Sequence, residues 1–384
     1  MKKVPRNVFI LGLVSFFNDM ASEMIYPIVP IFLTTVLKTS IPVFGIIEGI
    51  AEATAAFTKY LFGSLSDYFK KRKIFVVLGY SFGAISKLLI GLASGWPLVL
   101  TARLVDRSGK GLRTAPRDSL LLENANEKNR GFIFGFHRAF DSLGAVIGPL
   151  VALLLIYIFK ENIRLVFFLA FIPSVIGVIL LIILIKEKKF KEDVEKKLVK
   201  IKIKNLKPQF KIFLIASMLF ALGNSSDTFL ILRAKNLGLT TLLTTLTYVL
   251  YNISQTVFAT PAGKLADKIG AKKVFAIGLL IFSFVYFCFG FIKNPNFIWI
   301  IFPIYGLYIA FTDGVSKAYI SEFIDKKESG SYFGFYQTVI AAGTFFASAI
   351  GGLLWSKVAP SATFYYGSIM ALSAFILLRF SKSA

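Results

Sequence analysis

The sequence predicts an all-α membrane protein, with twelve transmembrane helices arranged in two six-helix bundles. Three observations predict this fold class: the composition, the recurrence of long apolar segments and an internal repeat. The chain has 384 residues, is 56% hydrophobic and has a mean hydropathy of +0.70, whereas soluble proteins are roughly half apolar. Apolar segments such as 163–185 and 275–292 can each cross a hydrocarbon core about 30 Å thick as a helix. A membrane location is therefore the starting interpretation.

Polar breaks divide the chain into twelve apolar segments, each of which we expect to be one helix. The first is long and contains Asn18, Asp19 and Glu23, so it is expected to be a retained helix rather than a cleaved signal peptide. An even number of spans places both termini on the same side of the membrane. The expected spans are 8–36, 43–66, 74–93, 97–121, 131–158, 163–185, 211–234, 241–262, 274–292, 297–322, 332–356 and 361–380.

The positive charge of the chain is distributed as a membrane topology requires. The formal net charge is +23, and Lys and Arg are concentrated at the N-terminus, at alternate loops and in the stretch 186–211. By the positive-inside rule this side is cytoplasmic, and contact with anionic lipid explains the excess of cations without nucleic acid. We therefore expect a multi-pass protein of the cytoplasmic (inner) membrane with both termini in the cytoplasm.

Cofactor chemistry has little support in the sequence. Cys288 is the only cysteine and lies in an apolar span, which argues against a disulfide or a thiol metal cluster. The Gly109-Lys110-Gly111 segment lacks the spacing of a phosphate-binding loop, and no strand precedes it. We expect no metal, no cofactor and no enzyme activity.

An internal repeat divides the chain into two related halves. The segment Gly63-Ser-Leu-Ser-Asp67-Tyr-Phe-Lys-Lys-Arg-Lys recurs 200 residues later as Gly263-Lys-Leu-Ala-Asp267-Lys-Ile-Gly-Ala-Lys-Lys, and 134–137 recurs as 333–336. Repeats of this kind are a transporter architecture, with the substrate site near the midplane. The expected domains are an N-terminal bundle at 1–185, a cytoplasmic linker at 186–210 and a C-terminal bundle at 211–384.

The second copy of this motif resembles the signature of the major facilitator superfamily, which lies between the second and third helices of each half. The helix number, the repeat and the central linker also fall where that family has them. The first copy departs from the pattern, because Tyr68 replaces a basic residue and Lys70 replaces a glycine. The resemblance implies the major facilitator fold and secondary transport by alternating access.

The paired motif predicts a conformational latch, defined here as Gly63, Asp67, Lys71 and Arg72 with Gly263, Asp267, Lys272 and Lys273. The glycines allow close helix approach, and each aspartate stands at a helix C-terminus, where the macrodipole disfavours a negative charge. We expect each carboxylate to pair with nearby cations and with the N-terminus of a helix in the opposite half, only in the outward-facing state. The alternative is a solvated loop that only sets topology.

The fourth helix carries the strongest signal of a site. Its charges recur three or four residues apart, so most share one helix face, and facing lipid would be costly. They are Arg103, Asp106, Arg107, Lys110, Arg113 and Arg117. The resemblance implies that this helix lines the transport cavity and that Arg103 lies near the arginine kept by proton-coupled members. Arg103 and Asp106 are coupling candidates, and Arg107 and Lys110 are substrate-cavity candidates.

Further carboxylates are expected to face this helix. Asp19 and Glu23 on the first helix and Asp141 on the fifth are coupling candidates, because a buried carboxylate beside arginine can exchange a proton. Fixed structural ion pairs are the alternative. Other substrate-cavity candidates are Glu48, Glu52, His137, Asn224, Asp227, Asp313 and Lys317, the last two being an i, i+4 pair.

A small-residue face marks the fifth helix. Gly135, Gly144, Gly148 and Pro149 provide a face for close packing and a proline that bends the helix. The spacing resembles the antiporter signature of drug and metabolite exporters, although Ala152 and Leu153 replace its closing glycines. The resemblance therefore favours antiport over symport.

These features predict a proton-coupled exporter of a small organic solute, acting as a monomer in contact with membrane lipid. The principal alternative is an exchanger or uniporter for organic anions or phosphorylated metabolites without proton coupling, favoured by the basic face of the fourth helix. Two other classes are alternatives. A membrane receptor would need an output domain, and none is visible in the sequence. A membrane enzyme would be distinguished by turnover of a substrate in detergent, without vesicles.

Overall fold

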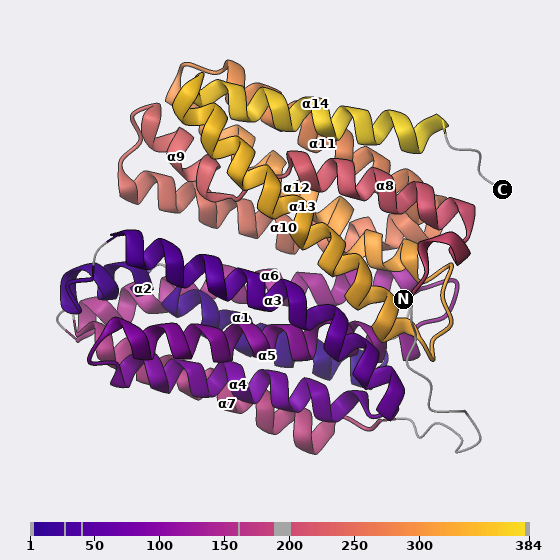
Figure 1. Ribbon diagram of the computed structural model, residues 1–384, viewed down its shortest axis with the longest axis horizontal. Helices are drawn as coiled ribbons and strands as arrows, with labels where there is room; N and C mark the ends of the chain where they lie inside the picture. The colour runs from indigo at the N-terminus through magenta and orange to yellow at the C-terminus, as the bar shows by residue number, and fades with distance from the viewer. Residues whose placement is uncertain (1–3, 27, 40, 160–161, 188–200, 381–384) are drawn as a thin grey trace. The chain divides into compact units, whose positions relative to one another are not determined.

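The computed structural model describes residues 4–26, 28–39, 41–159, 162–187 and 201–380. The regular elements of these residues are helices, and Figure 1 shows them in chain order. The first half contains α1 (Arg6–Ile25), α2 (Ile28–Ile31), the π-helix η1 (Phe32–Val36), α3 (Ile41–Phe69), α4 (Arg72–Leu92), α5 (Trp96–Glu123), α6 (Arg130–Ile158) and α7 (Ile163–Leu184). The second half contains η2 (Ile203–Asn205), α8 (Pro208–Gly223), α9 (Thr228–Asn236), α10 (Thr241–Ile269), α11 (Ala271–Phe291), η3 (Pro295–Phe297), α12 (Ile298–Ile320), α13 (Ser329–Lys357) and α14 (Pro360–Phe380).

The predicted twelve spans are confirmed. Nine helical segments of the described residues are long and apolar enough to cross a membrane, and the remaining three spans are α3, α5 and α10. The prediction of one continuous helix per span is wrong in two places. The first span is divided into α1, α2 and η1, and the seventh is divided into α8 and α9 by residues 224–227.

The contacts divide the chain into two compact units. The first unit is Met1–Ala125, Phe140–Lys200 and Ile324–Phe335, and the second is Asn126–Ala139, Ile201–Phe323 and Tyr336–Ala384. In the first unit α5 packs on α3 and α4, and α7 packs on α1 and α4. In the second unit α12 packs on α10 and α11, and α14 packs on α8 and α11. The same packing plan therefore recurs in both units, as the sequence repeat requires.

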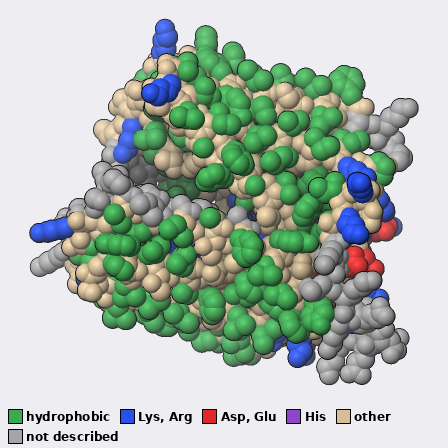
Figure 2. Space-filling view, viewed as in Figure 1, with side chains coloured by type: hydrophobic (Ala, Val, Ile, Leu, Met, Phe, Trp, Pro, Cys, Tyr) green, Lys and Arg blue, Asp and Glu red, His purple; other side chains and the backbone are tan. Residues whose placement is uncertain are grey.

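The outward faces of the helices are apolar, as contact with lipid requires. Phe57 is 72% exposed and Ile183 is 69% exposed. Figure 2 shows hydrophobic side chains over much of the visible face, while Lys and Arg side chains gather toward the helix ends. In lipid the backbone has no water to bind, so continuous helical hydrogen bonding is what makes these apolar segments stable.

Two arginines, Arg164 half-buried and Arg233 buried, donate to carbonyl groups at helix ends that would otherwise have no donor. Arg164 donates from Nη1 to the Gly91 carbonyl at 2.8 Å, at the C-terminus of α4. Arg233 donates from Nε to the Phe289 carbonyl at 3.0 Å and from Nη2 to the Ile292 carbonyl at 3.0 Å, at the C-terminus of α11. A positive charge at a helix C-terminus also interacts favourably with the macrodipole. Helices α4 and α11, which correspond in the repeat, are thus both capped by an arginine at the C-terminus.

Candidate functional site

Helix α5 carries the predicted charged face, and the structure buries three of its six charged side chains inside the first unit. Arg103, Arg113 and Arg117 are 5%, 8% and 7% exposed. Asp106 lies between two of the cations, 4.0 Å from Arg103 Nη1 and 4.0 Å from Arg107 Nε. The guanidinium of Arg113 stands over the Tyr80 ring at 4.6 Å, a cation–π contact. The face is therefore a compact, partly buried network of cations around Asp106 rather than a solvated stripe.

Asp19 and Asp141 meet at one end of this network. Asp141, Arg113 and Arg117 are all close enough to Asp19 to act on it electrostatically. Arg117 Nη1 lies 3.8 Å from Asp141 Oδ1 and donates to Ser15 Oγ at 3.0 Å. Two neighbouring carboxylates repel each other when both are ionised, so such a pair favours holding one proton. This pair is therefore a candidate for proton binding, with arginine beside it.

Lys87 is a member of this network that the sequence analysis missed. It lies on α4, is 1% exposed and donates from Nζ to the Gly83 carbonyl at 2.8 Å. It acts electrostatically on Asp106 together with Arg103, Arg107 and Arg113. A lysine in the middle of an apolar helix is itself a signal, because an isolated charge there is expensive.

Other predicted site residues are distributed over both units. Glu23 lies half-buried on α1 and Lys110 half-buried on α5, both in the first unit, whereas His137 is buried on α6 in the second unit. The side chains of Glu48 and Glu52 on α3 lie outside the described residues. Coupling and substrate roles for all of these residues stay predictions.

The candidates of the second unit form two groups. Asn224 donates from Nδ2 to Tyr308 Oη at 3.0 Å, and Asp227 accepts hydrogen bonds from two tyrosines at the break between α8 and α9. Asp313 on α12 pairs with Lys317 Nζ at 4.0 Å, as its spacing predicts, and more closely with Arg138 Nη1 on α6 at 3.0 Å. The sequence analysis did not identify Arg138 as a partner.

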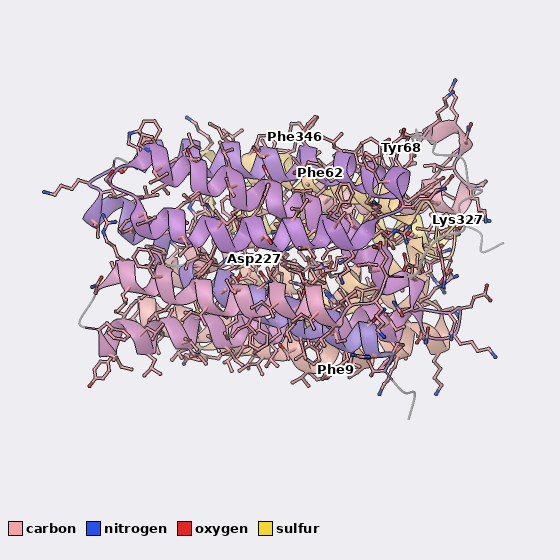
Figure 3. The ribbon with its side chains drawn as sticks, turned by 90° about the horizontal axis from the view of Figure 1, so that it is seen from below. Phe9, Phe62, Tyr68, Asp227, Lys327 and Phe346 are labelled. Atoms are coloured by element: carbon pink, nitrogen blue, oxygen red, sulfur yellow. The ribbon has the colours of Figure 1, made fainter. Side chains whose placement is uncertain are left out.

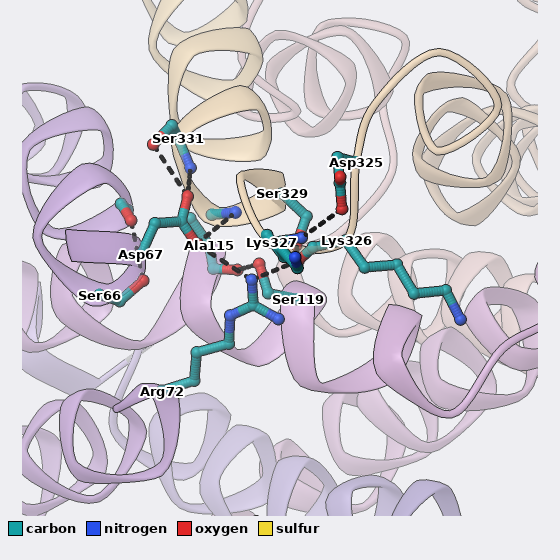
Figure 4. Close-up of polar contacts among 12 residues, drawn as sticks. Ser66, Asp67, Arg72, Ala115, Ser119, Asp325, Lys326, Lys327, Ser329 and Ser331 are labelled. Carbon is teal, nitrogen blue, oxygen red and sulfur yellow. Dashed lines mark hydrogen bonds and ion pairs between the residues drawn. The ribbon is translucent and has the colours of Figure 1, made fainter. Parts of the chain in front are cut away.

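The latch motif of the first unit holds its aspartate in a closed set of donors (Figure 4). Asp67 accepts from the Gly330 and Ser331 backbone amides at 3.2 and 2.6 Å and from Ser331 Oγ at 2.8 Å, all at the N-terminus of α13. Arg72 Nη2 lies 3.1 Å from the same carboxylate, and its Nη1 lies 2.5 Å from Glu123 Oε1. A carboxylate at a helix N-terminus is stabilised by the macrodipole and by unpaired amides.

The latch motif of the second unit repeats this geometry. Asp267 accepts from the Gly131 and Phe132 amides at 2.7 and 3.1 Å, at the N-terminus of α6. A Cβ at Gly263 would come within 2.0 Å of the Gly131 carbonyl oxygen, and one at Gly63 would come within 2.3 Å of the Gly330 carbonyl oxygen. Each glycine therefore brings one helix start close enough for the aspartate one turn later to reach it.

The cations of the motif are not used alike. Arg72 is 1% exposed, whereas Lys71 is exposed and the structure gives it no part in holding Asp67 among the described contacts. In the second copy Lys272 and Lys273 follow Asp267 at the start of α11. Whether these contacts open during transport is a prediction that the geometry alone does not test.

Replacing Asp67 with asparagine is expected to loosen the first turn of α13. The neutral amide is a weaker acceptor than the carboxylate, and hydrogen bonds to charged groups contribute roughly 1.5–3 kcal/mol each. Hydrogen exchange measured by mass spectrometry on peptides covering 328–335 should be about tenfold faster or more, as a loss of roughly 1.4 kcal/mol predicts.

The matched control for this measurement is Asp325→Asn, which removes an exposed carboxylate from the loop that precedes α13. Asp325 accepts only from the Lys327 amide at 2.9 Å in the contacts described. Exchange at Ser331 that responds equally to both substitutions would contradict the role given to Asp67.

The predicted small-residue face of α6 contacts two different helices. A Cβ at Gly144 would lie 2.6 Å from the Phe16 carbonyl oxygen, and one at Gly148 would lie 2.5 Å from the Met20 carbonyl oxygen, both on α1. Gly135 faces α10, where its Cβ would meet the Ala259 carbonyl oxygen at 2.4 Å. The face therefore brings α6 close to α1, so that Asp141 lies near Asp19. Pro149 follows Gly148 directly and also lies inside α6.

Comparison with known proteins agrees with this arrangement. The sequence pattern of the Major Facilitator Superfamily matches residues 11–248 and 212–383. The chain belongs to the major facilitator superfamily. A relative described as an uncharacterised MFS-type transporter of Methanocaldococcus jannaschii is 37% identical over 387 residues, covering 99% of this chain and 96% of the relative. The quinolone resistance protein NorA of Staphylococcus aureus is 27% identical over 143 residues, 37% of each chain.

Solved structures show the same fold at low sequence identity. The human organic anion transporter MFSD10 superposes with a TM-score of 0.85 at 13% identity, covering 98% of this chain and 100% of that chain. The Escherichia coli fucose:proton symporter FucP superposes with a TM-score of 0.73 at 13% identity, covering 98% of each chain. This superfamily protein is thus a multi-pass membrane transporter of small molecules with the major facilitator fold, and not an enzyme.

Proposed function

We propose that this superfamily member exports a small organic solute by proton-coupled antiport. The observation that carries the proposal is the placement of the Asp19 and Asp141 carboxyl groups within electrostatic reach of each other, beside Arg113 and Arg117. When the pair holds one proton, the arginines face a single negative charge. When the proton leaves, they face two, so the local field changes by a full charge. A site that binds and releases one proton next to mobile cations is what a coupling mechanism requires.

The change in charge of the Asp19–Asp141 pair acts on the rest of the charged network through Arg117. Arg117 contacts Asp141, Asp118, Ser15 and Tyr80 within 3.8 Å, so its guanidinium is held by groups on four helices, its own α5 included. A second charge on the aspartate pair attracts Arg117 away from its neutral partners, Ser15 and Tyr80. We propose that this shift biases the transporter toward one of its two alternating states, with the latch at Asp67 and Asp267 closed in the outward-facing state.

Export is supported by the region shared with a protein named for quinolone resistance and by the glycine face of α6. The positive-inside distribution supports a cytoplasmic membrane with both termini in the cytoplasm, and a monomer in contact with anionic lipid suffices for this mechanism. Residues 1–185 and 211–384 would be the two repeats, joined by the linker 186–210.

An exchanger for organic anions or phosphorylated metabolites is the second candidate. The observation that favours it is the group of cations Arg103, Arg107 and Lys110 on α5 in the first unit, of which Arg103 and Arg107 lie 4.0 Å from Asp106. Such a site would bind a phosphate or carboxylate without needing a proton.

Proteoliposomes with an internal pH dye distinguish the two candidates. A panel of cationic drugs, organic anions and sugar phosphates is added to protein-containing and empty vesicles. Antiport predicts that one class of compound drives proton movement, and an ionophore that removes the pH gradient should stop its uphill accumulation. Uptake or exchange of a sugar phosphate or organic anion without proton movement would contradict antiport and support the anion exchanger.

A further inference from the structure

The second unit contains a helix break that carries an acidic group. Helix α8 ends at Gly223 and α9 begins at Thr228, so residues 224–227 leave the helical hydrogen-bonding pattern inside a predicted membrane span. Broken membrane helices are tolerated where their polar groups face protein or a water-filled space, and they often form transporter binding sites. In the first repeat α1 ends at Ile25 and α2 begins at Ile28, and the two residues between them in the sequence, Tyr26 and Pro27, include no acid. The carboxylate is therefore a property of the second repeat alone.

Asp227 occupies the N-cap position of α9 but does not cap it. Its side chain makes no capping hydrogen bond, although aspartate is among the preferred capping residues. The carboxylate turns instead toward α12 and α10, where Oδ1 accepts from Tyr305 Oη at 2.7 Å and Oδ2 accepts from Tyr251 Oη at 3.4 Å. Figure 3 places Asp227 toward the middle of the helices' length. A purely structural aspartate at this position would be expected to bind the first amides of α9.

The partners of Asp227 in the described residues are neutral donors. The nearest charge that acts on it belongs to Arg138, and that guanidinium is engaged with Asp313 at 3.0 Å. A carboxylate away from water is costly without a cation. When it is ionised, Asp227 therefore places a negative charge in the site that two tyrosine hydroxyls orient but do not neutralise.

The tyrosines also present their rings around this carboxylate. The ring centroids of Tyr251 and Tyr305 lie 5.3 Å apart, those of Tyr305 and Tyr308 lie 5.0 Å apart, and those of Tyr248 and Tyr251 lie 5.2 Å apart. Tyr305 is 1% exposed, whereas Asp227 is half-buried and Ser226 beside it is exposed. The packed tyrosine rings therefore cover one side of the carboxylate, and the exposed residues of the helix break leave it accessible on the other. Aromatic faces attract cations, most strongly when desolvated.

We infer that Asp227 and the tyrosines Tyr248, Tyr251, Tyr305 and Tyr308 form a binding site for an organic cation, with the ammonium or comparable centre against the carboxylate and the rings. An anion would meet the Asp227 charge, and the hydroxyls of Tyr251 and Tyr305 already donate to that carboxylate. The inference names the substrate class of the exporter and, as a statement about transport, rests on the proposed function. As a statement about binding it stands alone, because it needs neither proton coupling nor Asp19.

The test uses tetraphenylphosphonium as the probe and tetraphenylborate as its isosteric anion. Saturable binding of each radiolabelled probe is measured by equilibrium dialysis on the full chain in nanodiscs, so that partition into lipid is subtracted with empty nanodiscs. Tetraphenylphosphonium should bind saturably, and Asp227→Asn should weaken it at least tenfold. Asp227→Glu should restore part of the affinity, and Tyr305→Leu should weaken binding more than Tyr305→Phe, which keeps the ring.

Asp325→Asn, which removes an exposed carboxylate of the loop before α13, is the matched control, and proton movement measured separately on the wild type tests the proposed function. Tetraphenylphosphonium binding that survives Asp325→Asn but not Asp227→Asn supports the cation site, even if the wild-type protein moves no protons. Binding of tetraphenylphosphonium that is indifferent to Asp227→Asn in a well-folded variant, or saturable binding of tetraphenylborate alone, would overturn it. Size-exclusion profiles and unfolding midpoints establish that each variant is folded.

Discussion

Asp19→Asn is expected to abolish proton-driven accumulation of substrate while leaving downhill exchange measurable. The asparagine amide keeps the size of the side chain and can hydrogen bond to Asp141, but it cannot release a proton. The pair then stays in a state equivalent to the protonated one, and the field on Arg113 and Arg117 no longer changes. Accumulation against a gradient should fall to the level of empty vesicles, because no proton energy reaches the transport cycle.

Three variants in the same proteoliposome assay make this expectation specific. Asp141→Asn should have the same effect, and the double variant should be no worse than either single one, since both act through one shared proton. Asp325→Asn, an exposed carboxylate of the loop before α13, should transport like the wild type. Undiminished proton movement in Asp19→Asn would remove this pair from the coupling mechanism and leave Glu23 or Asp106 as the next candidates.

The sequence predicted the parts of this molecule that local chemistry determines. Twelve apolar segments are helices because a membrane leaves the backbone no other way to satisfy its hydrogen bonds. Asp67 was expected to pair with Arg72 and a helix N-terminus, and the structure shows both contacts, although their role in transport is still a prediction. These features depend on residues close in sequence or on a repeat that appears twice.

The features that were missed depend on tertiary packing. Arg138 reaches Asp313 across 175 positions of sequence, and no spacing rule connects them. The break in the seventh span did leave a local signal, because Gly223-Asn-Ser-Ser-Asp227 is a run of turn-forming residues inside an apolar segment. Hydropathy averaged over the segment concealed it.

In the first copy of the repeated motif Lys70 stands where the second copy has Gly270, and this difference affects the backbone. Lys70 has a φ of 53°, in the left-handed region, where its counterpart Gly270 has a φ of 96°. A side chain in this region costs roughly 1–2 kcal/mol relative to glycine. The first unit retains the same turn between α3 and α4, so the packing of those helices on α5 is strong enough to hold it.

Gly263→Ala is expected to lower the stability of the protein more than the addition of a methyl group at any other residue of the latch. Its Cβ would lie 2.0 Å from the Gly131 carbonyl oxygen and 2.7 Å from the Gly131 carbonyl carbon, and backbone cannot move aside as a side-chain tip can. Separating α10 from the start of α6 costs about 1–3 kcal/mol in overpacking. It also lengthens the two amide hydrogen bonds to Asp267, which contribute roughly 1.5–3 kcal/mol each.

We therefore expect Gly263→Ala to lower the unfolding midpoint in detergent by several degrees, as about 2–4 °C per kcal/mol suggests for large domains, and to speed hydrogen exchange at 130–134. The matched control is Gly352→Ala on α13, where the nearest atom to a new Cβ is a Phe229 ring carbon at 3.8 Å. That methyl group meets ordinary contact distance and should be neutral or stabilise by about 0.5–1 kcal/mol, since alanine is the better helix former. Equal midpoints for the two variants would show that α6 can shift away from α10 without cost, and the close approach of Gly263 to Gly131 would then have no part in closing the latch.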